Sequence, residues 1–182
     1  MVSRIMRAIQ LSARTIRMKL CYFNKCVQTK GSFVDVSLSS RVYGKTGGSV
    51  SLGKGVTINR NATIAAVGGI IEIGRKCSLG RNCTIVAHEK ISIGENCMFG
   101  PGVTMYDHDH LFDSTGVITQ GYKTGAISIG SQCWIGANAI ILRGTQIGDG
   151  CVIGAGTVVR GVIPPHSIVT NNREMIVKPI QD

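Results

Sequence analysis

Histidine is the residue type in this chain best suited to acid–base chemistry, because its ordinary pKa lies close to neutral pH. The sequence has four of them, His88, His108, His110 and His166. Two belong to the stretch Asp-His-Asp-His at 107–110, where either aspartate could orient an imidazole. A histidine held in this way can accept a proton from an attacking hydroxyl group, so these residues are candidate general bases.

Spacing suggests two other chemistries. In an extended segment, His108 and His110 would place two nitrogens on one face, as a metal site requires. The stretch GSVSLGKG at 48–55 imitates a phosphate-binding loop, but Gly55 replaces the Ser or Thr that would hold magnesium. A six-residue repeat explains its glycines, so we do not expect nucleotide binding there.

That repeat also predicts the elements that position the histidines. Aliphatic residues return at every sixth position in four sets: Leu52, Ile58, Ile64; Ile73, Leu79, Ile85; Ile93, Phe99, Met105; and Ile129, Ile135, Ile141, Ile147, Ile153, Val159. Glycine usually follows each one, and a small residue, most often cysteine, lies four positions later. A helix cannot hold a period of six, whereas short strands joined by turns can. The sequence therefore predicts an all-β fold, a parallel β-helix with three faces per coil.

Breaks in the repeat indicate insertions. Three extra residues follow Ile64, two follow Ile85 and 18 follow Met105. The last insertion, about 108–125, is predicted to be a loop excluded from the coil, and loops of this length are usually functional. We expect residues 31–182 to form one β-helix domain.

Residues 1–30 form a basic leader in this interpretation, with seven Lys or Arg and no acid. Its apolar and arginine residues follow a loosely helical pattern, so residues 1–20 would either lie on an anionic membrane surface or pack against the prism or a neighbouring subunit. Basic residues interrupt the only candidate signal sequence, so export is not expected. The expected location is the cytoplasm, including the inner face of its membrane. The leader lacks the aromatic and groove-reading features of nucleic-acid binding.

Five of the seven cysteines fall in the small column of the repeat. We expect them to be buried as small apolar residues rather than to bind metal, and free thiols of this kind suit a reducing compartment.

Residues 50–180 resemble the hexapeptide-repeat acyltransferases. The resemblance is carried by ISIGSQCWIGANAIILRGTQIGDGCVIGAGTVV at 127–159, by the following Pro164-Pro165 and by FGPGVTMYDHDH at 99–110. Within this family the chain is most similar to sugar O-acetyltransferases of the galactoside and maltose type and to polysaccharide O-acetyltransferases. The resemblance implies a left-handed β-helix, a homotrimer, and acetyl-CoA bound between neighbouring prisms as the acyl donor, with no metal.

The resemblance also implies catalytic roles. The family's catalytic histidine falls on His110, with His108 as the alternative base. The backbone N–H of Ala137 would stabilise the oxyanion that forms when a hydroxyl attacks the thioester. Trp134 would pack beside the pantetheine arm of coenzyme A.

The remaining coenzyme A contacts are implied less directly. Ala155 matches a backbone contact in the GAGTVV turn. Arg160-Gly161 replaces the family's Thr-Lys pair, and Lys178 matches a basic position beyond a tail that departs from the family pattern.

Acceptor contacts in the family lie near the segment that reads RNCTIVAHEK here. Its local candidates are Asn82, His88 and Glu89, with His88 at a position that is commonly acidic. The expected reaction is O-acetylation of a carbohydrate acceptor in bacterial surface polysaccharide synthesis. Two alternatives stay open: a zinc enzyme resembling the trimeric carbonic anhydrases, and a β-helix scaffold without catalysis.

Overall fold

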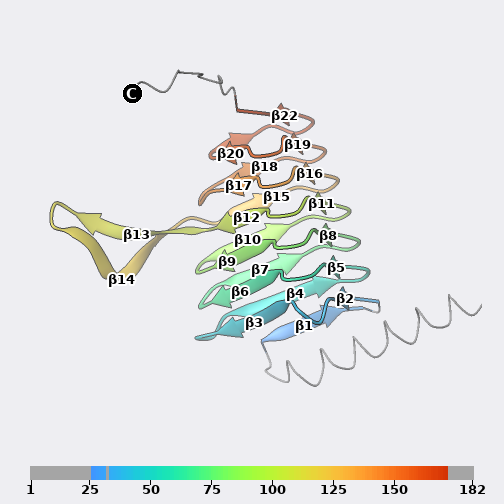
Figure 1. Cartoon of the computed structure of the whole chain (residues 1–182), viewed down its shortest axis with the longest axis horizontal. Helices are drawn as coiled ribbons and strands as arrows, with labels where there is room; N and C mark the ends of the chain where they lie inside the picture. The colour runs from blue at the N-terminus through green and yellow to red at the C-terminus, as the bar shows by residue number, and fades with distance from the viewer. Residues whose placement is uncertain (1–25, 32, 172–182) are drawn as a thin grey trace, which may run out of the picture.

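The computed structural model describes residues 26–31 and 33–171, which wind into a stack of three-sided coils (Figure 1). Each face of the stack is a parallel sheet, and we call the three faces sheets A, B and C in the order in which each coil visits them. This confirms the parallel β-helix with three faces per coil. It also agrees with the left-handed form that the resemblance implies.

Sheets A and B have seven strands each, and sheet C has six. Sheet A contains β1 (Val27–Lys30), β4 (Ser49–Gly53), β7 (Ile70–Ile73), β10 (Lys90–Ile93), β15 (Ile127–Ile129), β18 (Gln146–Ile147) and β21 (Val162–Ile163). Sheet B contains β2 (Asp35–Val36), β5 (Thr57–Ile58), β8 (Ser78–Leu79), β11 (Met98–Phe99), β16 (Trp134–Ile135), β19 (Val152–Ile153) and β22 (Ile168–Val169). Sheet C contains β3 (Arg41–Lys45), β6 (Thr63–Val67), β9 (Thr84–Ala87), β12 (Thr104–Tyr106), β17 (Ile140–Ile141) and β20 (Val158–Val159).

The six-residue repeat supplies the core. All of its fifteen aliphatic or apolar residues are buried, with at most 5% of their surface exposed. Strand pairing stacks them in register, as in Ile58 beside Leu79 and Ile85 beside Met105. The repeat does not reveal a second buried column on sheet A, where the longer strands alternate inward and outward residues. That column contains Val50, Ile71, Ile91 and Ile127.

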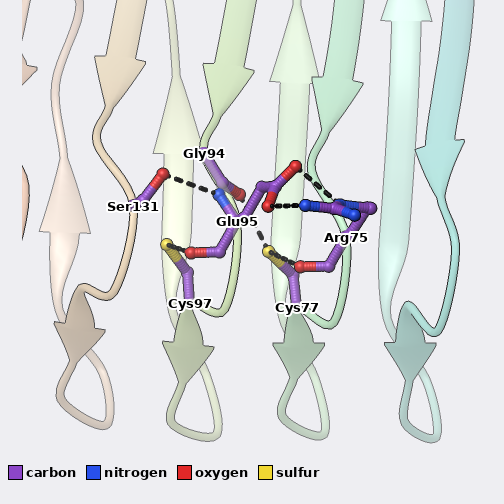
Figure 2. A network of polar contacts seen from close by, with 6 residues as sticks. All are labelled: Arg75, Cys77, Gly94, Glu95, Cys97 and Ser131. Atoms are coloured by element: carbon purple, nitrogen blue, oxygen red, sulfur yellow. Dashed lines mark hydrogen bonds and ion pairs between the residues drawn. The ribbon is translucent and has the colours of Figure 1, made fainter.

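The corner between sheets A and B holds a ladder of buried thiols. Cys77 donates a hydrogen bond to the carbonyl of Gly94 in the next coil at 3.0 Å, and Cys97 donates to Gly130 at 3.1 Å. Cys133 and Cys151 repeat the contact one and two coils further along. Figure 2 shows the first rung, from Cys77 to Gly94, together with Cys97 and the surface ion pair between Arg75 and Glu95. The five expected cysteines are all free and buried. Cys21 lies outside the described residues.

The insertions in the repeat all fall at one corner, between sheets C and A. The first two lengthen β6 and β9, whereas the third forms an antiparallel hairpin of β13 (His108–Asp113) and β14 (Gly116–Thr124). The predicted excluded loop is therefore an antiparallel hairpin whose register shifts between His110 and Leu111, and it projects sideways from the stack (Figure 1). Ile91 in β10 still pairs with Ile127 in β15, so the prism continues across the insertion without a shift in register.

The prism begins inside residues 1–30, the predicted basic leader, since β1 pairs with β4 along its whole length. The amphipathic pattern in residues 1–20 lies outside the described residues. In the ranges that the structure describes, no helix has the length and apolar character needed to cross a membrane.

Candidate active site

The hairpin begins at Asp107, whose side chain is completely buried. Its carboxylate accepts hydrogen bonds from the backbone N–H groups of His88 and Glu89 in the preceding coil, both at 2.8 Å. Nδ1 of His108 lies 3.1 Å from the same carboxylate. A carboxylate only accepts, so Nδ1 donates in this contact and Nε2 of a neutral ring is left as an acceptor. Asp107 thus fixes both the turn below the hairpin and one imidazole at its base.

Three of the four histidines gather at this point. The ring centroids of His88 and His108 are 4.0 Å apart, and Tyr122 on β14 lies 4.1 Å from His88. His110 faces Tyr122 directly across the hairpin, with ring centroids 5.1 Å apart. His166 lies between β21 and β22, at the corner of sheets A and B, and takes no part in the cluster.

The cluster is electrostatically unfavourable for a proton on His88. Burial lowers the pKa of His88 below its ordinary value, and the neighbouring His108 and His110 lower it further by repulsion. The Asp107 carboxylate opposes these effects only in part. His88 therefore stays neutral at a pH where an exposed histidine begins to take up a proton.

The two expected bases differ in exposure. Only 11% of the His108 side chain is exposed, because Asp107 and the neighbouring rings cover it. His110 is exposed on the hairpin. His108 is thus the better oriented of the two, and His110 is the more accessible to a substrate.

Asp109 does not orient an imidazole. Its carboxylate instead pairs with the guanidinium Nε of Arg143, which follows β17 in the next coil. A second link on this side is formed by Gly125, which donates to the Asp107 carbonyl and accepts from Gly144, both at 2.8 Å. The base of the hairpin is therefore tied to the coils on both sides. The sequence pattern does not predict this pairing of Arg143.

Ala137 lies at the corner between sheets B and C. A single corner position is occupied in successive coils by Arg60, Arg81, Pro101, Ala137 and Ala155; we call it the B–C ridge. The coils are linked beside it by backbone hydrogen bonds of 2.8 to 3.0 Å, such as Asn138 N–H to the Pro101 carbonyl.

The N–H of Ala137 donates no hydrogen bond to any residue in the described ranges. The backbone of Gly100 packs closely here, since a Cβ at that glycine would lie 2.6 Å from the Ala137 nitrogen. Proline fits the same position one coil earlier because no N–H is needed there. Ala137 therefore offers an unused donor on the surface of the prism.

The expected coenzyme A contacts lie at two different corners of the prism, at opposite ends of the sheet C strands. Trp134 is 53% exposed on the outer face of sheet B beside Met98, three residues before Ala137. Arg160 and Gly161 lie at the corner between sheets C and A, between β20 and β21, which is also the corner where the hairpin leaves the prism. Lys178 lies outside the described residues.

The expected acceptor residues are separated in the same way. Asn82 is exposed on the B–C side, next to Arg81, in a left-handed backbone conformation with φ of 59°. His88 and Glu89 lie at the base of the hairpin. One chain therefore does not bring these three residues together. In residues 26–31 and 33–171, no group of three or more His, Cys, Asp or Glu side chains is arranged to hold a metal ion.

Comparison with known proteins agrees with the repeat. Residues 126–160 match the family described as hexapeptide repeat of succinyl-transferase. This segment is therefore similar in sequence to the hexapeptide repeat of that family. Over 93 residues it is 38% identical to YvoF of Bacillus subtilis, which bears an acetyltransferase name, and the match covers 51% of the chain and 50% of YvoF. It is 47% identical over 64 residues to a Staphylococcus aureus protein also named as an acetyltransferase, covering 35% of the chain and 32% of that protein. The chain thus spans half or less of the length of these relatives.

Solved structures share the fold. A variant of AntD, an N-acyltransferase from Bacillus cereus bound to dTDP-4-amino-4,6-dideoxyglucose and coenzyme A, superposes with a TM-score of 0.70 at 18% identity, covering 85% of the chain and 82% of AntD. A hexapeptide-repeat acetyltransferase of Vibrio cholerae in complex with acetyl-CoA gives a TM-score of 0.51 at 28% identity, covering 54% of each chain.

Proposed function

We propose that the protein transfers the acetyl group of acetyl-CoA to a sugar hydroxyl, in a unit of a bacterial surface polysaccharide. The observation that carries this proposal is the histidine cluster held by Asp107 where the hairpin leaves a hexapeptide-repeat prism. The names of the matched relatives and the acetyl-CoA bound by the Vibrio cholerae protein support the donor. The acceptor is inferred from the family resemblance.

In this proposal His110 is the general base. As the acceptor oxygen attacks the thioester carbon, the imidazole takes the hydroxyl proton, and the C–S bond breaks in the following step to release coenzyme A. The thiolate that leaves is protonated by the imidazolium, so His110 returns to its neutral form. The exposure of His110 supports this assignment, while the contact of His108 with Asp107 supports His108 as the second candidate.

Attack on the thioester places negative charge on its oxygen. The free N–H of Ala137 is suited to bind that charge, because a fixed backbone donor needs no rearrangement during the reaction. Trp134 would then lie along the pantetheine arm, with Ala155, Arg160, Gly161 and Lys178 contacting the rest of the coenzyme.

The proposed site requires more than one copy of the chain. His110 follows the C-terminal end of β12, whereas Ala137 precedes the N-terminal end of β17, the next strand in sheet C. The two residues therefore lie at opposite ends of the sheet C strands. In a homotrimer, one prism can present its hairpin to the B–C ridge of its neighbour. The acceptor contacts Asn82, His88 and Glu89, which are also divided between these edges, would meet in the same way.

The test measures release of coenzyme A thiol from acetyl-CoA with a panel of simple sugars, nucleotide sugars and lipid-linked sugars. The variants are His110→Ala and His108→Ala. His166→Asn is the control, because it removes an exposed histidine outside the cluster and asparagine tolerates the left-handed φ of 58° at that position.

Acceptor-dependent release should fall by about 100-fold or more in His110→Ala. The control should keep full activity. A loss confined to His108→Ala would move the base to His108, and absence of acetyl-CoA binding in the wild type would overturn the proposed function.

A further inference from the structure

A cationic groove lies on the N-terminal coils of the prism, at a different corner from the histidine cluster. It has a volume of about 340 Å³ and is lined by Asn59, Arg60, Gly80, Arg81 and Pro101, and we call it the Arg60–Arg81 groove. This volume is in the range of small-molecule sites, about 300 to 1,000 Å³. None of its five lining residues carries a negative charge.

The two arginines are stacked on consecutive coils. Asn82, which follows Arg81, donates its N–H to the Arg60 carbonyl at 3.0 Å, so the two positions are one strand spacing apart, about 4.8 Å. Both arginines are exposed, and neither forms an ion pair with a residue that the structure describes. Arg75 and Arg143, by contrast, are each paired with a carboxylate. The groove is therefore lined by two arginines on adjacent coils, and neither is paired with a carboxylate among the described residues.

Guanidinium groups bind phosphate oxygens through two parallel hydrogen bonds, which gives both charge and geometric selectivity. Two of them on adjacent coils suit a ligand with two linked anionic groups. A diphosphate has this character, whereas a neutral sugar has no group that would use either charge.

The position of the groove relates it to the proposed reaction. Arg60 and Arg81 occupy the same B–C ridge as Ala137, and Pro101 lies on the coil between Arg81 and Ala137. Ala155, the expected coenzyme A contact, lies on the other side of Ala137 along this ridge. A ligand in the groove therefore approaches the thioester position from the end opposite to the coenzyme.

We propose that the Arg60–Arg81 groove binds a diphosphate group of the acceptor, so that the sugar is acetylated while it is attached to a diphosphate. The role of the bound diphosphate as part of the acceptor rests on the proposed function. Binding of a diphosphate in the groove does not. The diphosphate can belong to a nucleotide or to a lipid carrier, and both place the same anion on the two arginines.

The test measures equilibrium binding by calorimetry without acetyl-CoA, using inorganic pyrophosphate, UDP and farnesyl diphosphate as separate probes. The variant is the double substitution Arg60→Gln/Arg81→Gln. The control is Lys54→Gln/Lys76→Gln, which removes the same two charges at the A–B corner, where both lysines are exposed outside the groove.

All probes that bind should lose about tenfold or more in affinity in the arginine variant, and none in the lysine variant. Tight binding of UDP alone would assign the nucleotide source, and tight binding of farnesyl diphosphate alone would assign the lipid source. The proposal is overturned if no probe binds the wild type, or if the arginine and lysine variants behave alike. Because no acyl transfer takes part, these results are independent of whether the His110 assay succeeds.

Discussion

The carboxylate of Asp107 and Nδ1 of His108 are held 3.1 Å apart where the hairpin leaves the prism. The same carboxylate also receives the backbone N–H groups of His88 and Glu89. One buried side chain therefore connects the geometry of the candidate site to the coil beneath it.

Asp107→Asn should destabilise the protein. An amide has one acceptor oxygen, so at least one of the buried N–H donors loses its partner, at a cost of about 2–3 kcal/mol. The melting temperature should fall by about 5–10 °C. Asp113→Asn is the control, because that exposed carboxylate caps only Thr115 at the hairpin tip and its replacement should leave the melting temperature nearly unchanged. Equal effects at both positions would contradict the role of Asp107.

The lowered pKa of His88 predicts loss of stability in acid. In the unfolded chain His88 protonates near its ordinary value of 6.5, whereas the folded chain resists protonation until a lower pH. The contribution of neutral His88 to the free energy of unfolding is therefore fully present above pH about 6.5. It is lost as the pH falls from about 6.5 toward the pKa of His88 in the folded protein. The wild type should lose more stability than His88→Gln between pH about 7.5 and about 5.

An NMR titration of the His88 ring measures the cause directly. His110→Gln should raise the pKa of His88, because it removes one repelling charge. His166→Asn should leave that pKa unchanged. If His88 titrates at or above its ordinary value in the wild type, burial and repulsion do not control it.

The pair between Asp109 and Arg143 should affect catalysis more than stability. Half of the Asp109 side chain is exposed, so loss of the ion pair itself in Arg143→Ala should cost under about 1 kcal/mol. The Arg143 side chain is only 15% exposed, so loss of its packing adds to this cost. Without the ion pair between Asp109 and Arg143, the hairpin and His110 should shift. The value of kcat should therefore fall while acetyl-CoA binding is retained. The matched control is Arg75→Ala, which breaks a surface pair that lies away from the hairpin. Equal activity of the two variants would exclude a positioning role for Arg143.

Two thiols of the ladder, Cys97 and Cys133, should be inert toward alkylation in the folded protein. Burial raises the pKa of Cys133 to about 11, and the pKa of Cys97 is raised by its contact with Cys77 and by burial. Thiolate is the reactive form, so neither residue should be modified by iodoacetamide at pH about 8. Peptide mass spectrometry before and after denaturation checks this, with the less buried Cys26 as the internal comparison. Rapid native labelling of Cys97 or Cys133 would show that the ladder opens.

The six-residue repeat predicted the core because burial in this fold follows directly from chain periodicity. It missed Val50 and Ile71, which lie on longer strands where alternation adds a second inward position. The contact between His88 and His108 could also have been found. Three steps of the repeat make one coil, so the pairing of Ile85 with Met105 already places these histidines at one corner.

Other parts of the candidate site could not be derived from the repeat. The direction of the hairpin, and with it the pairing of Asp109 with Arg143, depends on contacts outside the regular coil. The stacking of Arg60 on Arg81 follows from the same three-step rule, through the pairing of Ile58 with Leu79, but the open groove beside them does not. The unused N–H of Ala137 likewise depends on the backbone hydrogen bonds at the corner, which a sequence repeat does not reveal.

The coils also predict how the molecule fails. Each coil is bonded only to the ones before and after it, so unfolding can begin at either end and advance as in a zipper. The hairpin leaves after β12, the fourth of six strands in sheet C. Fraying of the outermost coils therefore leaves intact the rungs that support the histidines, and the interior position of the hairpin protects the site against the commonest local openings.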